Sequence, residues 1–149
     1  MKPSIPTLNL FPHKHFITTR WHDNDVYGHV NNVVYYSWFD TAVNAYLMNQ
    51  GVLDYENGKT VGLVVKTQCN YYKPVAFPDS ISVGVAVSKI GNSSVRYELG
   101  IFKNKESEAC ASGHFIHVYV DKGTHKPVSI PDQLKHALQA IESTAFSDQ

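Results

Sequence analysis

The sequence of 149 residues contains few cysteines, no excess of charge of either sign and no long apolar run. Its two cysteines, Cys69 and Cys110, are expected to be buried thiols in a reducing compartment rather than a disulfide. The 13 basic and 13 acidic residues cancel, which disfavours a nucleic-acid binder or a charge-driven membrane-surface protein. No segment approaches the roughly 18 apolar residues of a membrane span, and residues 1–10 lack a signal-peptide core. A cytoplasmic protein without membrane or nucleic-acid partners is therefore expected.

Several common catalytic motifs are also absent. The sequence has no G-x-S-x-G, G-x-x-x-x-G-K-[ST] or G-x-G-x-x-G, so it lacks the nucleophile elbow and the usual phosphate and dinucleotide cradles. Its 8 histidines invite a metal site, but there is no H-E-x-x-H motif. On a strand, His114 and His117 would point to opposite faces and could not share a ligand. No metal and no other cofactor is expected.

The sequence does contain enough apolar residues, 43% of the total, to build one core without a metal or disulfide. Residues 1–14 are rich in proline and predict an irregular arm, and residues 15–21 predict a first strand. Apolar residues recur at spacings of three and four from residue 30 to residue 47. They predict one helix of about 18–20 residues that ends before Gly51, with Asn31 and Asn32 as candidate N-caps.

Alternating apolar residues predict four further strands, at residues 61–75, 81–88, 95–102 and 110–120. In the first of these, alternation places Leu63, Val65, Thr67, Cys69 and Tyr71 on one face. Short connections at residues 91–92 and 104–106 predict an antiparallel meander. Residues 131–145 have apolar residues at helical spacing and predict a C-terminal helix. The expected architecture is a single α+β domain over residues 1–149, in which an antiparallel sheet curls around the long helix, with residues 125–149 as a C-terminal extension.

The segment from residue 20 to residue 36 carries the most chemical information. A polar loop with Asp25 and Gly28 leads into the N-terminus of the long helix, where backbone N–H groups lack intrahelical partners and favour negative charge. A carboxylate beside such donors suits acyl transfer, because the donors stabilise an oxyanion while the carboxylate attacks or activates water. A thioester is the sensible substrate, since its thiolate leaves readily. The simpler interpretation also stands: Asp25 caps the helix, Gly28 serves a turn, and His29 is a neutral surface histidine.

The run W-H-D-N-D-V-Y-G-H-V-N-N-V-V-Y-Y-S-W-F-D resembles the signature of hotdog-fold acyl-CoA thioesterases of the 4-hydroxybenzoyl-CoA thioesterase type. The resemblance implies that Asp25 is the catalytic aspartate and that residues 28–32 begin the central helix. A second plan in this family uses a glutamate on that helix, and no glutamate lies between Val30 and Gly51. The resemblance also implies a homodimer or homotetramer with a continuous sheet and an active site between two subunits. The partner's strand, near residues 64–67, would then form one wall.

The combined prediction is hydrolysis of an acyl-CoA or aryl-CoA to free acid and CoA without a cofactor. Asp25 would be general base or nucleophile, with backbone N–H groups around Gly28 and His29 as the oxyanion hole. The residues expected to bind substrate are Tyr27, Asn31, Asn32, Tyr35, Val65, Lys66 and Thr67. The candidates for the CoA phosphates are Lys66, Lys73, Arg96 and Lys103.

Two other functions remain open at this stage. A hotdog hydratase or dehydratase would use His22 or His29 together with Asp25, and a non-catalytic acyl-CoA-binding protein would bind thioesters without turnover. The aromatic residues 35–39 suit an aryl or long acyl group, but they suit the protein core as well.

Overall fold

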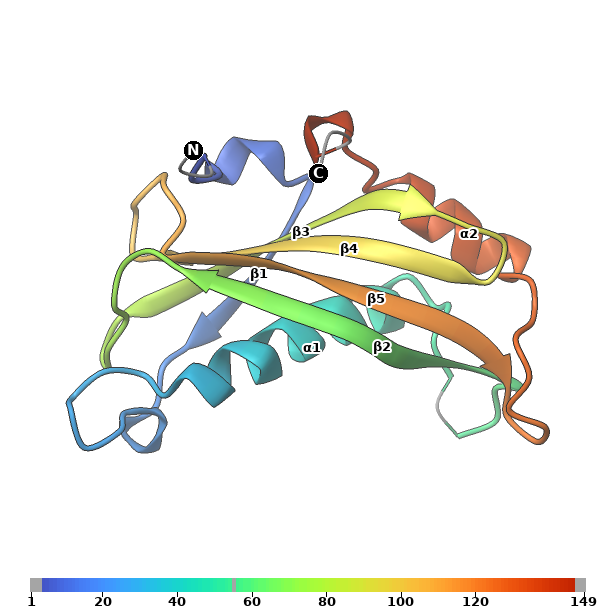
Figure 1. The fold of residues 1–149 in the computed structure, drawn as a ribbon, viewed down its shortest axis with the longest axis horizontal. Helices are drawn as coiled ribbons and strands as arrows, with labels where there is room; N and C mark the ends of the chain where they lie inside the picture. Colours follow the sequence, from blue (N-terminus) through green and yellow to red (C-terminus); the bar gives the residue numbers. More distant parts are fainter. Residues whose placement is uncertain (1–3, 55, 147–149) are drawn as a thin grey trace.

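The computed structural model describes residues 4–54 and 56–146, which form a 5-stranded antiparallel sheet of order β1-β3-β4-β5-β2 (Figure 1). The strands are β1 (His13–Thr18), β2 (Thr60–Tyr71), β3 (Ser80–Ile90), β4 (Ser94–Lys103) and β5 (Ala111–Asp121). The helices are α1 (Asn32–Asn49) and α2 (Asp132–Gln139), with short 3-10 helices at Leu8–Leu10, Trp21–Asp23 and Thr144–Phe146. The sheet curls around α1, so the predicted hotdog fold is confirmed.

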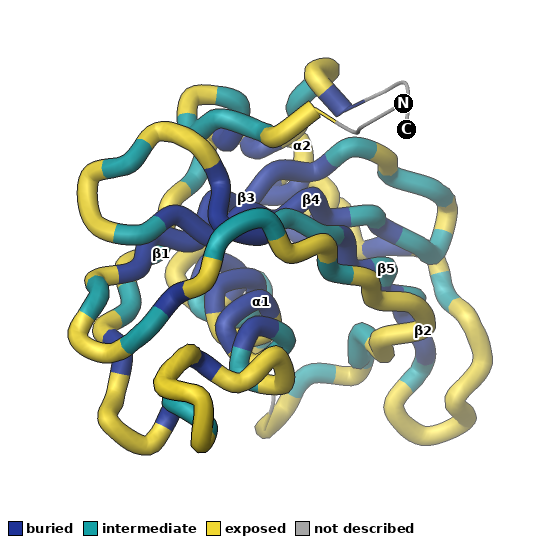
Figure 2. The backbone as a smooth tube through the Cα atoms, turned by 60° about the vertical axis from the view of Figure 1, so that its left-hand side comes forward, coloured by how far each residue is buried: buried dark blue, intermediate teal, exposed yellow. Residues whose placement is uncertain are grey.

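Helix α1 forms the centre of the core, as its apolar periodicity predicts. The side chain of Asn31 caps it by accepting a hydrogen bond from the N–H of Val33 at 3.0 Å. The helix ends where Gly51 adopts a φ of +71°, a conformation that favours glycine. Figure 2 shows α1 buried beneath the central strands, while β2 is largely exposed. Within the described residues, no helix is long and apolar enough to cross a membrane.

Two predicted elements are longer than the observed ones. The strand predicted to reach residue 75 ends at Tyr71, because the N–H groups of Tyr72 and Lys73 both turn to the carbonyl of Cys110, at 2.7 and 3.0 Å. The helix predicted over residues 131–145 ends at Gln139. Beyond it the chain pairs with the main chain of Val87 in β3, and these hydrogen bonds replace further helical turns.

A β-bulge in β2 changes which side chains share a face. The pairing with β5 shifts by one residue between Val64 and Lys66, which leaves Val65 as the extra residue. Simple alternation predicts Leu63 and Thr67 on the same face. The bulge places them on opposite faces, so this part of the prediction is wrong.

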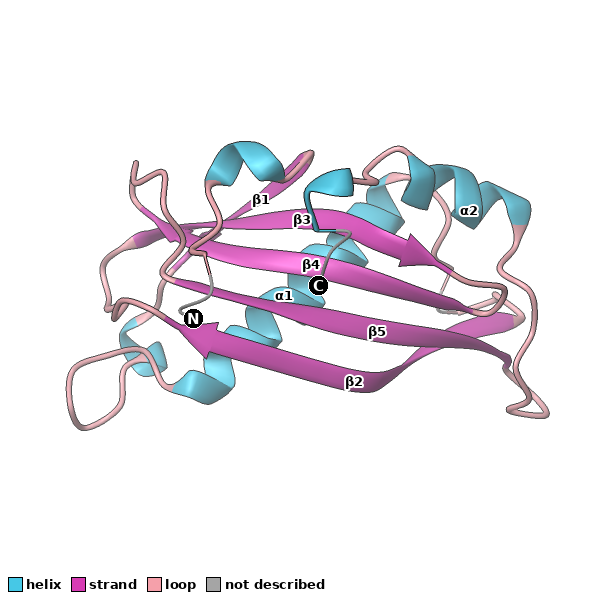
Figure 3. Ribbon diagram, turned by 45° about the horizontal axis from the view of Figure 1, so that its top comes forward, coloured by secondary structure: helices cyan, strands magenta, loops and turns pink. Residues whose placement is uncertain are grey.

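The sheet has an inner face, which packs on α1, and an outer face, which the two ends of the chain partly cover (Figure 3). Phe11 is 2% exposed and lies over Gly84 and Gly100. A Cβ atom on Gly84 would lie 2.6 Å from Cγ of Phe11, so this close packing requires glycine. The ring of Phe146 meets that of Phe11 at 5.2 Å. The arm predicted as irregular is therefore packed at Phe11, and β1 begins earlier than predicted, at His13.

Candidate active site

The loop between β1 and α1 is held by Asp23, which is 2% exposed. Its carboxylate accepts hydrogen bonds from the backbone N–H of Arg20 at 2.8 Å and from the Arg20 guanidinium at 2.8 and 3.1 Å. Its backbone carbonyl accepts a hydrogen bond from the N–H of Asn31, the capping residue of α1, at 2.9 Å. One buried aspartate thus ties the end of β1 to the start of α1.

Asp25 lies in the middle of this loop with its side chain partly exposed. One carboxylate oxygen, Oδ1, accepts a hydrogen bond from the N–H of Tyr27 at 2.8 Å, and its own N–H donates to the carbonyl of His29 at 2.8 Å. The other oxygen has no hydrogen-bond partner in residues 4–54 and 56–146. The carboxylate is therefore oriented on one side and open on the other, as a general base or nucleophile requires.

The end of this loop and the start of α1 offer backbone donors within seven residues of Asp25 in the sequence. Gly28 has a φ of +80°, and its N–H closes the turn by donating to the carbonyl of Asp25 at 3.1 Å. The N–H groups of His29 and Asn32 have no partner within the described part of the chain. Because the helix dipole places partial positive charge at this end, these two groups can stabilise an oxyanion.

A cavity of about 310 Å³ opens beside the start of α1. Three predicted site residues, His29, Asn32 and Tyr35, line it from the helix side. Opposite them lie residues from the end of β2 and the chain that follows, namely Tyr71, Tyr72, Lys73 and Pro74. The fold therefore joins the start of α1 to the end of β2 in one recess.

The aromatic wall of the cavity is neutral near physiological pH. The rings of Tyr35 and Tyr71 meet edge to face at 5.0 Å, and the Tyr71 hydroxyl donates to the carbonyl of Asn32 at 3.4 Å. Burial raises the pKa of Tyr35 to about 12, and it also raises the pKa of Tyr71. Behind them, burial raises the pKa of the free thiol of Cys69 to about 11. These three groups therefore supply no base or nucleophile at neutral pH.

The other predicted residues do not line this cavity, and these include Asp25, Gly28 and Asn31 of the preceding loop. Tyr27 is 84% exposed at the tip of the loop. Val65, Lys66 and Thr67 lie in the middle of β2, roughly 13–20 Å along the strand from Tyr71. One chain therefore does not bring these three residues to the cavity.

The sequence predicted no functional role for Tyr71 and Tyr72, and it predicted Lys73 only as a candidate for the CoA phosphates, yet all three line the cavity. Their position depends on how the end of β2 packs against α1, and residue spacing carries no signal for that contact. The sequence predicted no role for Asp23 either. The feature that could have indicated a structural role is its position two residues before Asp25, in a loop that must hold its shape.

Residues 19–138 match the family model described as the Thioesterase-like superfamily. This chain belongs to that superfamily. The match spans the loop of Asp25, α1 and all strands from β2 to β5. Membership confirms the resemblance noted in the sequence and supports thioester hydrolysis as the general reaction of this thioesterase-like protein.

Individual proteins are similar to this chain along most of its length. The PA5185 protein of Pseudomonas aeruginosa is 51% identical, with a TM-score of 0.92 over 95% of this chain and 99% of its own. A thioesterase from Thermus thermophilus, solved with coenzyme A and zinc, is 30% identical, with a TM-score of 0.74 over 89% of this chain and 96% of its own. The uncharacterized protein YsmA of Bacillus subtilis is 31% identical over 82% of both chains. In the described residues of this thioesterase-like chain, no group of three or more His, Cys, Asp or Glu side chains could hold a metal ion.

Proposed function

We propose that this protein hydrolyses an acyl-CoA or aryl-CoA thioester to the free acid and coenzyme A. The observation that carries the proposal is the half-open carboxylate of Asp25 in the loop that leads to two unpartnered N–H groups, those of His29 and of Asn32 at the start of α1. Thioester hydrolysis needs both parts, because donors must stabilise the oxyanion while a carboxylate drives the attack. Superfamily membership and the coenzyme A bound by the relative from Thermus thermophilus support the choice of substrate.

Two reaction routes are open to the Asp25 carboxylate and the backbone N–H donors. In the general-base route, Asp25 takes a proton from water as the water oxygen attacks the thioester carbonyl. His29 and Asn32 donate to the resulting oxyanion, which collapses, breaks the carbon–sulfur bond and releases the CoA thiolate. The proton held by Asp25 then passes to the thiolate. In the nucleophilic route, an Asp25 oxygen attacks the carbonyl and expels the thiolate, and water hydrolyses the mixed anhydride.

Mass spectrometry of the quenched enzyme during the first turnover separates these routes. The nucleophilic route adds the mass of the acyl group to the loop that carries Asp25, and the general-base route adds nothing. The thioester leaving group is good in both routes, so neither requires a strong general acid beside the sulfur.

The second wall of the site is proposed to come from a second copy of the chain, paired along β2. This strand lies at the edge of the sheet, and the apolar residues Leu63, Val64 and Val65 are 45%, 46% and 59% exposed on it. A long apolar edge is a template for pairing with another strand. Antiparallel pairing about a two-fold axis near residue 68 would set residues 65–67 of one copy beside Tyr71 of the other.

Lys73 is the proposed first contact for the CoA phosphates. Of the four basic candidates, Lys73 lines the cavity, and its ammonium lies at 3.4 and 3.9 Å from the carboxylates of Glu106 and Glu108. These are long, partly exposed ion pairs, which a phosphate can replace at little cost. Lys103 lies close by and donates to the carbonyl of Pro74 at 3.0 Å.

The test of the reaction is CoA release, followed with a thiol reagent, over short, long, branched and aryl acyl-CoAs. The proposal predicts catalytic turnover with at least one acyl class, and the preferred class identifies the substrate. Tight binding of acyl-CoA without release of CoA from any member of the panel would contradict the proposal. That outcome would establish the non-catalytic binding function instead.

A further inference from the structure

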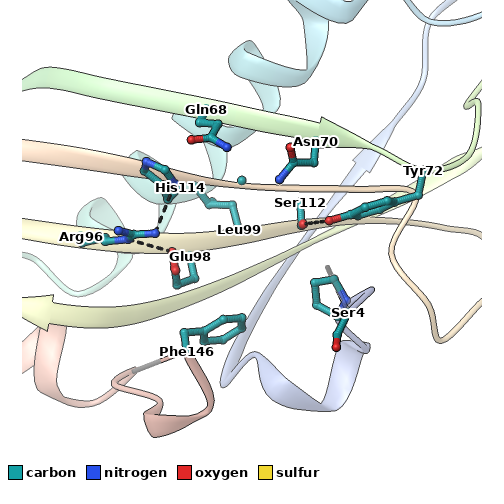
Figure 4. A pocket seen from close by; sticks show the side chains of 12 residues that line it. Ser4, Gln68, Asn70, Tyr72, Arg96, Glu98, Leu99, Ser112, His114 and Phe146 are labelled. Atoms are coloured by element: carbon teal, nitrogen blue, oxygen red, sulfur yellow. Dashed lines mark hydrogen bonds and ion pairs between the residues drawn. The ribbon is translucent and has the colours of Figure 1, made fainter. Parts of the chain in front are cut away.

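A pocket of about 400 Å³ lies on the outer face of the sheet, where β4, β5 and β2 run side by side (Figure 4). Its floor carries the polar side chains of Gln68, Asn70, Arg96, Glu98, Ser112 and His114. Phe146 and Ser4 stand at its rim (Figure 4). This floor lies across the sheet from α1, and the pocket shares one lining residue, Tyr72, with the cavity beside α1.

Strand register builds this floor. Glu98 of β4 pairs with His114 of β5, which pairs in turn with Gln68 of β2. The three side chains therefore form one row on the same face of the sheet. Ser112 and Asn70 pair in the next row, about 6.7 Å further along the strands. Because three hydrogen-bonded strands hold both rows, the polar groups are fixed in place before any ligand arrives.

His114 presents a buried donor without an acceptor. The side chain is 8% exposed, and its Nδ1 lies 3.3 Å from a guanidinium nitrogen of Arg96. A guanidinium only donates, so Nδ1 is the acceptor and Nε2 carries the hydrogen. Burial, with the positive charges of Arg96 and Lys66, lowers the pKa of His114, which agrees with a neutral ring. Nε2 is buried and finds no partner among the described residues, and such a donor is costly unless an acceptor reaches it.

Glu98 presents a buried acceptor with too few donors. It is 3% exposed, and its carboxylate receives one long contact, from Nε of Arg96 at 3.4 Å. Its other oxygen has no hydrogen-bond partner in the part of the chain that the structure describes. A carboxylate accepts several hydrogen bonds, so Glu98 can accept a further one from a donor group on a ligand.

The charges around the floor favour a ligand that carries an anionic group. Arg96 and Glu98 are the charged side chains that line the pocket, and their charges cancel. Lys66 does not line the pocket, but its positive charge acts on His114 and makes the local excess positive. The volume lies within the range of small-molecule sites, roughly 300–1,000 Å³.

We propose that this pocket binds a small carboxylate with a hydrogen-bond donor on the neighbouring carbon, as α-hydroxy acids and α-amino acids have. The ligand carboxylate accepts from Nε2–H of His114 and from the side-chain amides of Gln68 and Asn70. The hydroxyl or ammonium group of the ligand donates to Glu98. This pairing gives an acceptor to the buried Nε2–H of His114 and a further donor to the Glu98 carboxylate.

Isothermal titration of the full-length protein tests the site with defined probes. Lactate and alanine carry both groups, whereas acetate and ethylamine each carry one. We expect saturable binding of lactate or alanine, at least about tenfold tighter than either single-group probe. The comparison of lactate with alanine shows whether the natural donor is a hydroxyl or an ammonium group.

Two variants connect the binding to the pocket. Glu98→Gln and His114→Gln keep much of the side-chain shape, and each is expected to weaken binding at least about tenfold. His117→Gln changes a buried histidine of the same strand on the opposite face, and binding should survive in this control. Melting curves confirm that each variant folds.

Three results would overturn the proposal. The first is no saturable binding of lactate or alanine, and the second is binding that both pocket variants retain. The third is displacement of the probe by coenzyme A, which would make the pocket part of the path of the thioester. Because no step of this test measures hydrolysis, its result is independent of whether the protein hydrolyses thioesters.

Discussion

Asp23 and Asp25 are two residues apart in the sequence, yet their side chains have different roles. Asp23 is buried and accepts hydrogen bonds from both the backbone and the side chain of Arg20. Asp25 keeps one carboxylate oxygen without a protein partner in the described residues. Local spacing does not separate these roles, because both residues are acidic and lie in the same loop. The resemblance points to Asp25, and the three-dimensional contacts explain why Asp23 accompanies it.

The buried role of Asp23 predicts a loss of stability when its charge is removed. Asp23→Asn loses charge-assisted hydrogen bonds and should lower the free energy of unfolding by about 1–3 kcal/mol. Urea denaturation measures the change. Arg20→Ala and the double variant complete the cycle, and the two effects should not be additive, because both groups belong to one contact. Additive effects would mean that the ion pair does not hold the loop.

His117 predicts how stability depends on pH. Burial lowers its pKa below the ordinary value of 6.5, and the negative charge of Asp40 opposes this shift. The imidazole of His117 therefore binds a proton more readily in the unfolded chain than in the folded chain. Its contribution to the free energy of unfolding is fully present above pH 6.5 and is lost as the pH falls from 6.5 through the lowered pKa of the folded state. His117→Phe should reduce the stability difference between about pH 7.5 and 5.5 in urea titrations. His136→Gln, at an exposed histidine of α2, is the control, and an equal reduction in both variants would refute the assignment.

At the scale of elements, the periodicity of apolar residues predicted the long helix well, because the features that define this helix lie within its own stretch of sequence. Its apolar face and the cap Asn31 are local in sequence, and both appear in the structure. The strands were found, but their ends depend on distant partners. The bulge at Val65, the early end of β2 and the short α2 each follow from hydrogen bonds to another strand. Such bonds leave no local pattern.

The cap of α1 predicts a joint effect on folding and activity. Asn31→Ala removes the acceptor for the N–H of Val33, which should cost about 0.5–2 kcal/mol of stability. Because the first turn of α1 also carries the proposed oxyanion donors, kcat should fall as well. Asn31→Ser retains a capping oxygen and should restore both properties, as measured by urea denaturation and CoA release. Full activity in Asn31→Ala would separate the cap from the site.

At the scale of the whole molecule, the fold leaves two different edges. The β2 edge exposes consecutive apolar residues, whereas β1 exposes Phe16 among polar neighbours. The sequence predicted a curled sheet around one helix, and the structure confirms it. It did not predict that the end of β2 would meet the start of α1, because these segments lie far apart in the chain. Residues 65–67 reach an active site only if a second copy supplies them.

The proposed pairing of β2 strands predicts the effect of a charge at that edge. Val65→Lys places an ammonium at a position that is 59% exposed in one chain, and it should shift a dimer toward monomer in sedimentation velocity. CoA release should fall in parallel. Phe16→Lys makes the same change on the other edge strand, at a residue that is 77% exposed, and it should leave the dimer and the activity intact. A stable dimer in Val65→Lys would place the interface elsewhere.

The most direct test of the central claim is CoA release by Asp25→Asn under saturating thioester. We expect kcat to fall about 10²–10⁴-fold with acyl-CoA binding retained, because the amide keeps the contact to Tyr27 but cannot accept a proton or attack. Asp54→Asn is the matched control, since the carboxylate of Asp54 also accepts backbone hydrogen bonds in an exposed turn, and its activity should match the unaltered protein. A kcat for Asp25→Asn within tenfold of the unaltered protein would show that Asp25 is not the base or nucleophile and that it only shapes the turn.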